Sequence, residues 1–473
     1  NEDTAEYLYI VDELPLSLEE REAYTRMKNV LEYELRAPKG EESLTQSFHK
    51  QLPEIMTRHP KILGSISPIG TKKIMYYLEQ DIAGYGKIDP LMFDPYVEDI
   101  SCSGVNKPIF LWHRRYENIK TNVYFNDEEE LEDFAMKIVH KAGKHVSIAF
   151  PIVDVTLQGK HRLAVSYGRE VTPAGTSFTI RKFREDPFTI IDLIKNETID
   201  ENIAAYLWLL VENKMSLMMI GATGAGKTTS LNAIACLIRP NYKIISVEEV
   251  AEINLPHENW VSTISRSGFG VESEGEIPLF DLIKSAVRHR PDLIIVGEIR
   301  GEEAYVLFQA LATGHGGLCT IHAEDVETAI KRLTQPPMNI PPAIIPLMNC
   351  AIVVKHVRQP IFDQTSGRQL SSRKFIRVSE IKNADTIHDI FTWDPSTDTF
   401  QENLSNSFLL KNIARSLSVS MERLKRELEH RREVLLWMTE QNIRDYRSLN
   451  NYLSKYYHSP PSLYEKFSGE LSR

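Results

Sequence analysis

Short apolar runs alternate with longer amphipathic segments in the second half of the chain. The runs predict strands over residues 217–220, 243–248, 293–297, 318–322 and 351–355. Apolar residues at helical spacing between them predict helices, notably over 278–290 and 302–313. Strands that alternate with helices are typical of a mostly parallel sheet covered by helices. We therefore expect an α/β core over residues 203–358.

The pattern is different before and after this core. Residues 1–65 read as helical, with a capping box at Ser17, and residues 66–187 mix strands and helices without a βαβ order, which predicts a small α+β domain. Residues 188–202 are the predicted linker. Residues 359–473 form a C-terminal extension that becomes polar and irregular after Pro360 and ends in helices.

The last helical segment carries an apolar stripe at heptad-like spacing that is interrupted at Arg431. Its members are Met421, Leu424, Leu428, Leu435 and Met438. Because the stripe is shorter than three heptads, core packing is favoured over a partner-binding coiled coil.

Composition narrows the class of protein. A chain of 473 residues with 42% hydrophobic and 25% charged residues suits two or three globular domains. The four cysteines form no C-x-x-C, so we expect a reducing compartment and no zinc site. No apolar run reaches the roughly 20 residues of a membrane helix, and a net charge of -10 disfavours nucleic-acid binding as the main activity. The chain opens on Asn rather than Met, which suggests that its start has been trimmed.

One motif points directly to a ligand. Residues 221–228 match G-x-x-x-x-G-K-[ST] at every fixed position, between a predicted strand and a predicted helix. Backbone N–H groups of such a loop surround a phosphate, and the following helix adds partial positive charge. The predicted nucleotide-binding residues are Gly221, Ala222, Thr223, Gly224, Ala225, Gly226, Lys227, Thr228 and Thr229. Lys227 would reach the β- and γ-phosphates, and the Thr228 hydroxyl would bind Mg²⁺.

Two carboxylates end predicted strands and compete for the role of catalytic base. Glu298 follows the apolar run 293–296 after one intervening residue, Gly297, and could hold Mg²⁺ or polarise the attacking water. Glu248 ends the strand 243–248, and Glu249 and Glu252 beyond it are expected to be exposed. The sequence does not decide between Glu248 and Glu298.

His315 and His322 flank a further predicted strand, one before it and one after it. Metal binding is weakly supported, because no third ligand has a compatible spacing. From the residues alone, ordinary satisfied polar positions are favoured for both.

Together these segments resemble the type II/type IV secretion ATPase superfamily. Four boxes occur in the family's order: the phosphate loop, an acidic box at 244–252, a Walker B segment at 290–300 that ends in Gly-Glu-Ile-Arg, and a histidine box at 313–323. Residues 87–100 and 177–182 also look like the N-terminal domain of archaeal members. The resemblance covers roughly residues 70–360.

The resemblance implies a RecA-like ATPase domain that uses ATP and Mg²⁺, and it favours catalytic roles for both His315 and His322. It also implies a cytoplasmic homo-hexamer that works at the inner face of the cell membrane through a membrane platform protein, during pilus or pseudopilus assembly or secretion. In this family, arginines of the N-terminal domain reach the nucleotide. Arg162 and Arg181 match those positions, and Arg169 is a weaker candidate. Pairing of these arginines with surface acids is the alternative.

Two departures from the family pattern bear on this interpretation. Glu248-Glu249-Val250 stands where Glu-Asp-Pro is common, which puts the role of Glu249 in doubt. The tetracysteine zinc module of many bacterial members is absent from this sequence, which favours the archaeal branch. An archaellum assembly or rotation motor is a close alternative, and a RecA-like nucleic-acid translocase is an alternative from another class.

Overall fold

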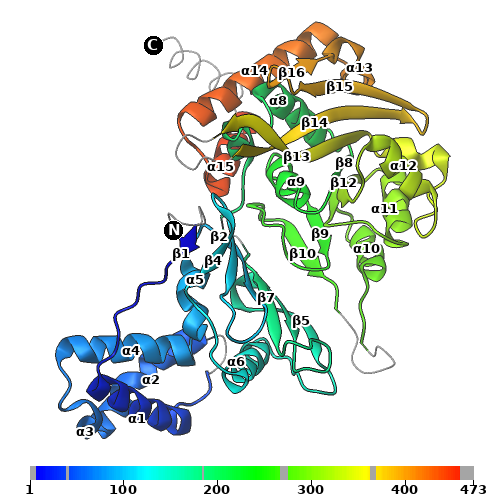
Figure 1. Cartoon of the computed structure of the whole chain (residues 1–473). Helices are drawn as coiled ribbons and strands as arrows, with labels where there is room; N and C mark the ends of the chain where they lie inside the picture. Colours follow the sequence, from blue (N-terminus) through cyan, green and yellow to red (C-terminus); the bar gives the residue numbers. More distant parts are fainter. Residues whose placement is uncertain (1–6, 39–41, 184–185, 267–274, 363–368, 459–473) are drawn as a thin grey trace. The chain divides into compact units, whose positions relative to one another are not determined.

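The computed structural model describes residues 7–38, 42–183, 186–266, 275–362 and 369–458, and the side chains of 358–371 lie outside that description (Figure 1). Contacts along the chain divide it into two compact units, Asn1–Phe183 and Arg184–Arg473. In the described residues, no helix is both long and apolar enough to span a membrane.

The first unit begins with a helical subdomain. Its helices are α1 (Leu18–Glu34), α2 (Leu44–Arg58), α3 (Pro60–Leu63) and α4 (Pro68–Ile82). The predicted capping box is confirmed, since the Ser17 hydroxyl accepts from the Glu20 N–H while the Glu20 carboxylate accepts from the Ser17 N–H. Apolar residues of α1, α2 and α4 form a separate core.

A seven-stranded sheet forms the rest of the first unit, in the order β1-β4-β3-β2-β7-β6-β5. The strands are β1 (Leu8–Tyr9), β2 (Val97–Cys102), β3 (Phe110–His113), β4 (Glu117–Thr121), β5 (Ile152–Thr156), β6 (Arg162–Ser166) and β7 (Ser177–Arg181). The short helices η1 (Gly86–Ile88), α5 (Asp89–Phe93) and η2 (Gln158–Lys160) connect elements of this unit. Helix α6 (Glu128–Lys141) packs its apolar side, including Leu131 and Ile138, against one face of the sheet.

The second unit is built on a nine-stranded sheet in the order β10-β9-β11-β12-β8-β13-β14-β15-β16. Its strands are β8 (Leu217–Ile220), β9 (Ile244–Glu248), β10 (Trp260–Ile264), β11 (Leu293–Val296), β12 (Gly316–Ile321), β13 (Cys350–Phe362), β14 (Gln369–Asn383), β15 (Thr386–Asp394) and β16 (Thr399–Glu402). Neighbours from β10 to β13 pair in parallel, and the pairs from β13 to β16 are antiparallel. The predicted α/β fold with a mostly parallel sheet is confirmed.

Alternate side chains of the central strands enter two different cores, which shows that helices cover both faces of this sheet. Leu217 and Met219 of β8 join one core, and Met218 and Ile220 join the other. The first core includes α7 (Ile190–Lys195), α8 (Glu201–Glu212), α9 (Lys227–Ala235), α13 (Phe408–Ser416), α14 (Met421–Glu440) and α15 (Tyr446–His458). The second includes α10 (Leu279–Arg288), α11 (Glu303–Ala312), α12 (Val326–Thr334) and η3 (Pro342–Leu347).

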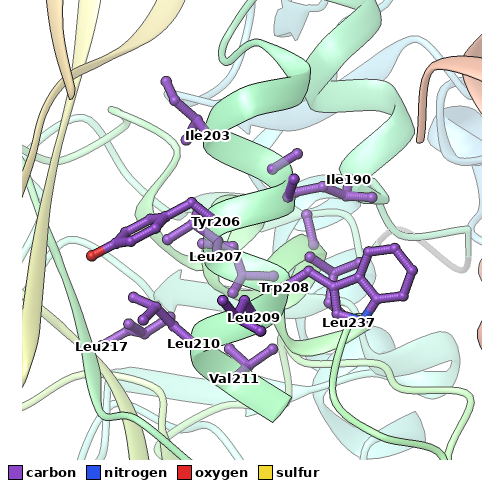
Figure 2. Close-up of a cluster of buried hydrophobic side chains, with 14 of the residues drawn as sticks. Ile190, Ile203, Tyr206, Leu207, Trp208, Leu209, Leu210, Val211, Leu217 and Leu237 are labelled. Carbon is purple, nitrogen blue, oxygen red and sulfur yellow. The ribbon is translucent and has the colours of Figure 1, made fainter. Parts of the chain in front are cut away.

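Helix α8 is apolar on all sides because it is enclosed by the first core (Figure 2). Figure 2 shows Tyr206 and Trp208 of α8 together with Ile190 of α7 and Leu217 of β8. Ile190 and its neighbours in α7 are buried, so the segment 188–202, predicted as a linker, packs within the second unit. The stripe on α14 also packs into this core, as predicted, since Leu424, Leu428, Leu435 and Met438 are buried there and Met421 packs against it.

The prediction of an irregular chain after Pro360 is wrong. Strands β14, β15 and β16 extend the parallel sheet with antiparallel pairs, before the short helix η4 (Leu404–Asn406) and α13. The sequence pattern did not indicate these strands because charged residues interrupt it. Lys374 and Glu380 are buried within β14, although charged residues usually lie on an exposed face. Lys374 pairs with Asp398 at 2.8 Å, and Glu380 accepts from Tyr206 and from N–H groups at the start of α13.

Candidate functional site

The phosphate loop takes the shape that its glycines predict. It follows the fully buried strand β8 and leads into α9, whose N-cap is Gly226. Gly224 and Gly226 have φ values of +75° and +95°, a region that L-residues with side chains rarely adopt. A Cβ at Gly221 would lie 2.5 Å from the Val354 carbonyl oxygen, so this end of the loop packs directly against the backbone of β13.

The side chain of Lys227 is held close to the loop. Its Nζ donates to the Ala222 carbonyl at 3.0 Å and lies 3.3 Å from Nδ1 of His322. Burial lowers the pKa of Lys227, and the charge of Glu298 only partly offsets that effect. The half-buried Thr228 side chain follows at the start of α9, and it makes no hydrogen bond within the described residues.

Glu298 and His322 meet at the edge of the sheet where β11 and β12 end. The strands pair in register from Leu293 with Gly316 to Val296 with Cys319, which brings the residues that follow them to the same edge. His322 Nε2 faces Glu298 Oε1 at 3.0 Å, and Arg300 Nη2 donates to Glu298 Oε2 at 2.6 Å. Lys227, His322 and Glu298 thus form one cluster beside the phosphate loop.

Burial and neighbouring charges shift the pKa values of the residues in this cluster. Burial acts to raise the pKa of Glu298, but the hydrogen bond and charge of Arg300 and the charges of His322 and Lys227 hold it below its usual range. Burial and the charge of Lys227 lower the pKa of His322. Lys227 Nζ contacts Nδ1 of His322, and the other ring nitrogen, Nε2, lies on the side of Glu298.

Glu248 lies in a different environment from Glu298. It is 1% exposed, and its Oε1 accepts at 2.8 Å from the N–H groups of both Glu252 and Ile253. A Cβ at Gly297 would lie 3.3 Å from Glu248 Cγ, so a larger residue between β11 and Glu298 would press on the Glu248 side chain. Glu248 therefore organises the loop after β9, while Glu298 faces Lys227 and His322.

The two histidines are not brought together. His315 precedes β12 and His322 follows it, so the two histidines lie at opposite ends of this strand. Six strand residues at roughly 3.3 Å each place them about 20 Å apart. Nδ1 of His315 contacts the Thr313 hydroxyl at 3.0 Å and the Ala310 carbonyl at 3.1 Å. The expectation that both histidines serve the phosphate loop is therefore supported within this chain for His322 only.

Arg162 and Arg181 lie in the first unit, directly opposite each other on β6 and β7. Arg162 Nε donates to Asp154 at 3.1 Å, and Arg181 Nε donates to Asp99 at 3.3 Å. Arg169 is paired with Glu128 through two hydrogen bonds of 2.8 Å. All three arginines thus contact acids, as the alternative interpretation expected, although Arg162 and Arg181 keep 40% and 60% of their side chains exposed.

Two further arginines lie at the site, and the sequence analysis predicted no role for either. Arg300 bridges Glu298 and Glu249, and its place in the Gly-Glu-Ile-Arg segment is the signal that could have revealed it. Arg373 of β14 reaches the phosphate loop, where its Nε lies 3.4 Å from the Gly224 carbonyl oxygen. No local pattern marks Arg373, because 149 residues separate it from Gly224.

The family model described as "Type II/IV secretion system protein" matches residues 98–390. The chain belongs to the type II/IV secretion system protein family. The membership that the four boxes indicated is confirmed, and the match extends beyond them, from β2 in the first unit to β15 in the second. Strand β14, which carries Arg373, lies within the family's matched region.

Relatives of this secretion family include archaeal proteins. Uncharacterized protein MJ0900 of Methanocaldococcus jannaschii is 37% identical over 94% of this chain and 79% of its own length. Uncharacterized protein MJ1287 of the same organism is 42% identical over 54% of this chain and 94% of its own. The putative conjugal transfer protein Rv3659c of Mycobacterium tuberculosis is 32% identical over 52% of this chain and 71% of its own.

Solved structures of secretion and pilus motors are also similar to this chain. The VirB11 ATPase of the Brucella suis type IV secretion system shares 21% identity over 62% of this chain and 92% of its own, with a TM-score of 0.30. The pilus retraction motor PilT with bound ADP shares 19% identity over 61% of this chain and 81% of its own, with a TM-score of 0.43.

Proposed function

We propose that this protein is an ATPase that hydrolyses ATP to ADP and phosphate and thereby drives pilus or pseudopilus assembly or protein secretion. The observation that carries the proposal is the cluster of Lys227, His322 and Glu298 beside a complete phosphate loop. Membership of the secretion family supports the same function.

The residues of the site fit a nucleoside triphosphate with Mg²⁺. A Cβ at Gly224 would meet nothing within 4 Å, which leaves the tip of the loop accessible to phosphate oxygens, and α9 directs its N-terminal N–H groups and positive dipole end toward them. The proposed contacts are made by residues 221–229, with Lys227 at the β- and γ-phosphates. The Thr228 hydroxyl would bind Mg²⁺ and Glu298 would hold the ion through a water molecule, and the ion would neutralise charge on the phosphate oxygens.

Glu298 is the proposed general base, in preference to Glu248. The water oxygen forms a bond to the γ-phosphorus, the bond from that phosphorus to the β,γ-bridging oxygen breaks, and the water proton passes to the Glu298 carboxylate. The low pKa of Glu298 keeps this carboxylate charged and able to accept a proton. Arg300 donates a hydrogen bond to one of its oxygens, and His322 Nε2 lies 3.0 Å from the other.

Arg162 and Arg181 are proposed to complete the site when the two domains close on the nucleotide. Their ion pairs with Asp154 and Asp99 are solvent-exposed, so exchanging these carboxylates for phosphate oxygens costs little. A guanidinium that arrives only on closure would neutralise charge that develops on the γ-phosphate and would couple hydrolysis to motion.

The proposed setting is a homo-hexamer in the cytoplasm, held at the inner face of the membrane by a polytopic platform protein. Family membership supports a role beside a membrane secretion system. The archaellum motor remains the close alternative, and the proposed activity is shared by both systems.

The direct test is Mg²⁺-dependent phosphate release from ATP by the purified full chain. Lys227→Ala should abolish release while the circular dichroism spectrum and melting temperature stay unchanged. Lys331→Ala, which removes an exposed lysine of α12, is the matched control and should retain full activity. Substantial hydrolysis by Lys227→Ala would overturn the site assignment.

A further inference from the structure

Strand β14 provides a side chain to the phosphate loop from a distant part of the chain. In the sheet order, β8 ends at the loop, β13 lies next to β8, and β14 lies next to β13 (Figure 1). The register pairs Ile220, the last residue of β8, with Val353 of β13. The hairpin of β13 and β14 therefore continues past the end of β8, alongside the loop.

Two close contacts show that this hairpin packs against one side of the phosphate loop. Gly221 packs against the carbonyl oxygen of Val354, as described above, and the tip of the loop packs against Arg373. A Cβ at Gly226 would lie 2.8 Å from Arg373 Cδ, and Arg373 Nε lies 3.4 Å from the Gly224 carbonyl oxygen. Both glycines of the tip thus face the same arginine.

The charge of Arg373 is available for a ligand. Its side chain is exposed, and within the described residues no carboxylate forms an ion pair with it. Arg377, further along the same strand, differs because Asp389 and Glu327 both pair with it. At 3.4 Å, the contact between Arg373 and Gly224 is a weak hydrogen bond, and the guanidinium makes no other hydrogen bond among the residues that the structure describes.

We infer that Arg373 is a phosphate-binding residue that contacts the diphosphate part of a nucleotide held in the loop. This inference rests on the proposed function and adds to it a cation that belongs to the same chain as Lys227. A planar guanidinium suits this role because it can donate two parallel hydrogen bonds to phosphate oxygens. Through Arg373, the β13–β14 hairpin would contact a nucleotide bound in the loop.

The test compares binding of ADP and of inorganic pyrophosphate to full-length variants by isothermal titration calorimetry. Arg373→Ala should raise the Kd of both ligands by about tenfold to 100-fold, the range of a hydrogen bond to a charged group. Arg373→Lys should recover part of the loss. Arg415→Ala removes an exposed arginine of α13 that has no ion pair within the described residues, and it should leave both Kd values unchanged.

Arg373→Gln separates this role from that of a neutral brace for the loop. Glutamine keeps an N–H donor that can bond to the Gly224 carbonyl but has no charge. A phosphate-binding role predicts that Gln is as defective as Ala. Wild-type affinity of either variant would overturn the inference while wild-type hydrolysis still supports the proposed function. Failure of the wild type to bind ADP would overturn both.

Discussion

Nε2 of His322 lies 3.0 Å from the Glu298 carboxylate, although 24 positions of the sequence separate the two residues (322 − 298 = 24). On its other side, the His322 ring contacts Lys227 at 3.3 Å. The imidazole therefore connects the cation of the phosphate loop to the carboxylate after β11. Arg332 of α12 also donates to the His322 carbonyl, which fixes the backbone at this point.

Replacing Glu298 should separate hydrolysis from nucleotide binding. Glu298→Gln keeps the size of the side chain but removes the proton acceptor, so kcat should fall by about 10²- to 10⁴-fold while the affinity for ADP changes little. Steady-state phosphate release and ADP titration measure the two quantities.

Glu248→Gln is the matched comparison, because that amide oxygen can still accept from the N–H groups of Glu252 and Ile253. It should retain most of the turnover. A larger loss of kcat from Glu248→Gln than from Glu298→Gln would reverse the assignment of the base.

The acid side of the pH profile should depend on His322. Its pKa lies below the usual range, because of burial and the charge of Lys227, so the ring stays neutral through neutral pH and takes up a proton only below about pH 6.5. The imidazolium would repel Lys227 and hold the Glu298 carboxylate as an ion pair, which lowers its basicity. kcat should therefore fall as the pH drops below that value.

Two histidine variants test this origin. His322→Asn should be less active but should lose the fall in kcat below about pH 6.5. His315→Asn, at the opposite edge of the sheet, should keep the wild-type profile. If the fall persists in His322→Asn and disappears in His315→Asn, the placement of the functional histidine is wrong.

Features set by neighbouring residues could be predicted from the sequence, whereas contacts between residues far apart in the chain could not. The loop at 221–228 and the strands that precede Glu298 and Glu248 were readable, because apolar runs and glycine spacing are local signals. The choice between Glu248 and Glu298 was not, because it depends on the groups that each carboxylate meets after folding, which are backbone N–H groups for Glu248 and the Arg300 guanidinium for Glu298.

The antiparallel strands after β13 were not predicted from the sequence for a related reason. Lys374 and Glu380 occupy buried positions in β14 because they find ionic or hydrogen-bonding partners in other parts of the unit. A charged residue paired over such a distance looks exposed in the sequence. The contact of Arg373 with the phosphate loop was hidden together with its strand.

The arginines of the first unit should affect turnover more than binding. Arg162→Ala and Arg181→Ala are each expected to lower kcat by up to about 10³-fold with little change in the Kd for ADP, because the proposed contact forms only as charge develops on the γ-phosphate. Single-turnover hydrolysis and ADP titration give the two quantities.

Arg114 offers a control of the same kind, since it also pairs with a carboxylate, that of Glu98, at 3.3 Å. Arg114→Ala should hydrolyse ATP like the wild type. Equal turnover in all three variants would contradict the proposed contact of Arg162 and Arg181 with the γ-phosphate.

The buried guanidinium of Arg431 makes the second unit's stability depend on its carboxylate partners. Arg431 is 3% exposed, contacts Glu212 of α8 and Glu427 of α14, and stacks over the Trp208 ring at 4.8 Å. Glu212→Gln removes one of the two opposing charges while the cation stays buried. The free energy of unfolding should fall by about 3 kcal/mol, measured by denaturant titration.

Arg431→Met should lower the free energy of unfolding by less, because an apolar side chain suits the surrounding core. Glu429→Gln breaks only the exposed pair with Arg432 and should change stability by less than about 1 kcal/mol. If Glu212→Gln were as mild as Glu429→Gln, the buried cation would not depend on Glu212.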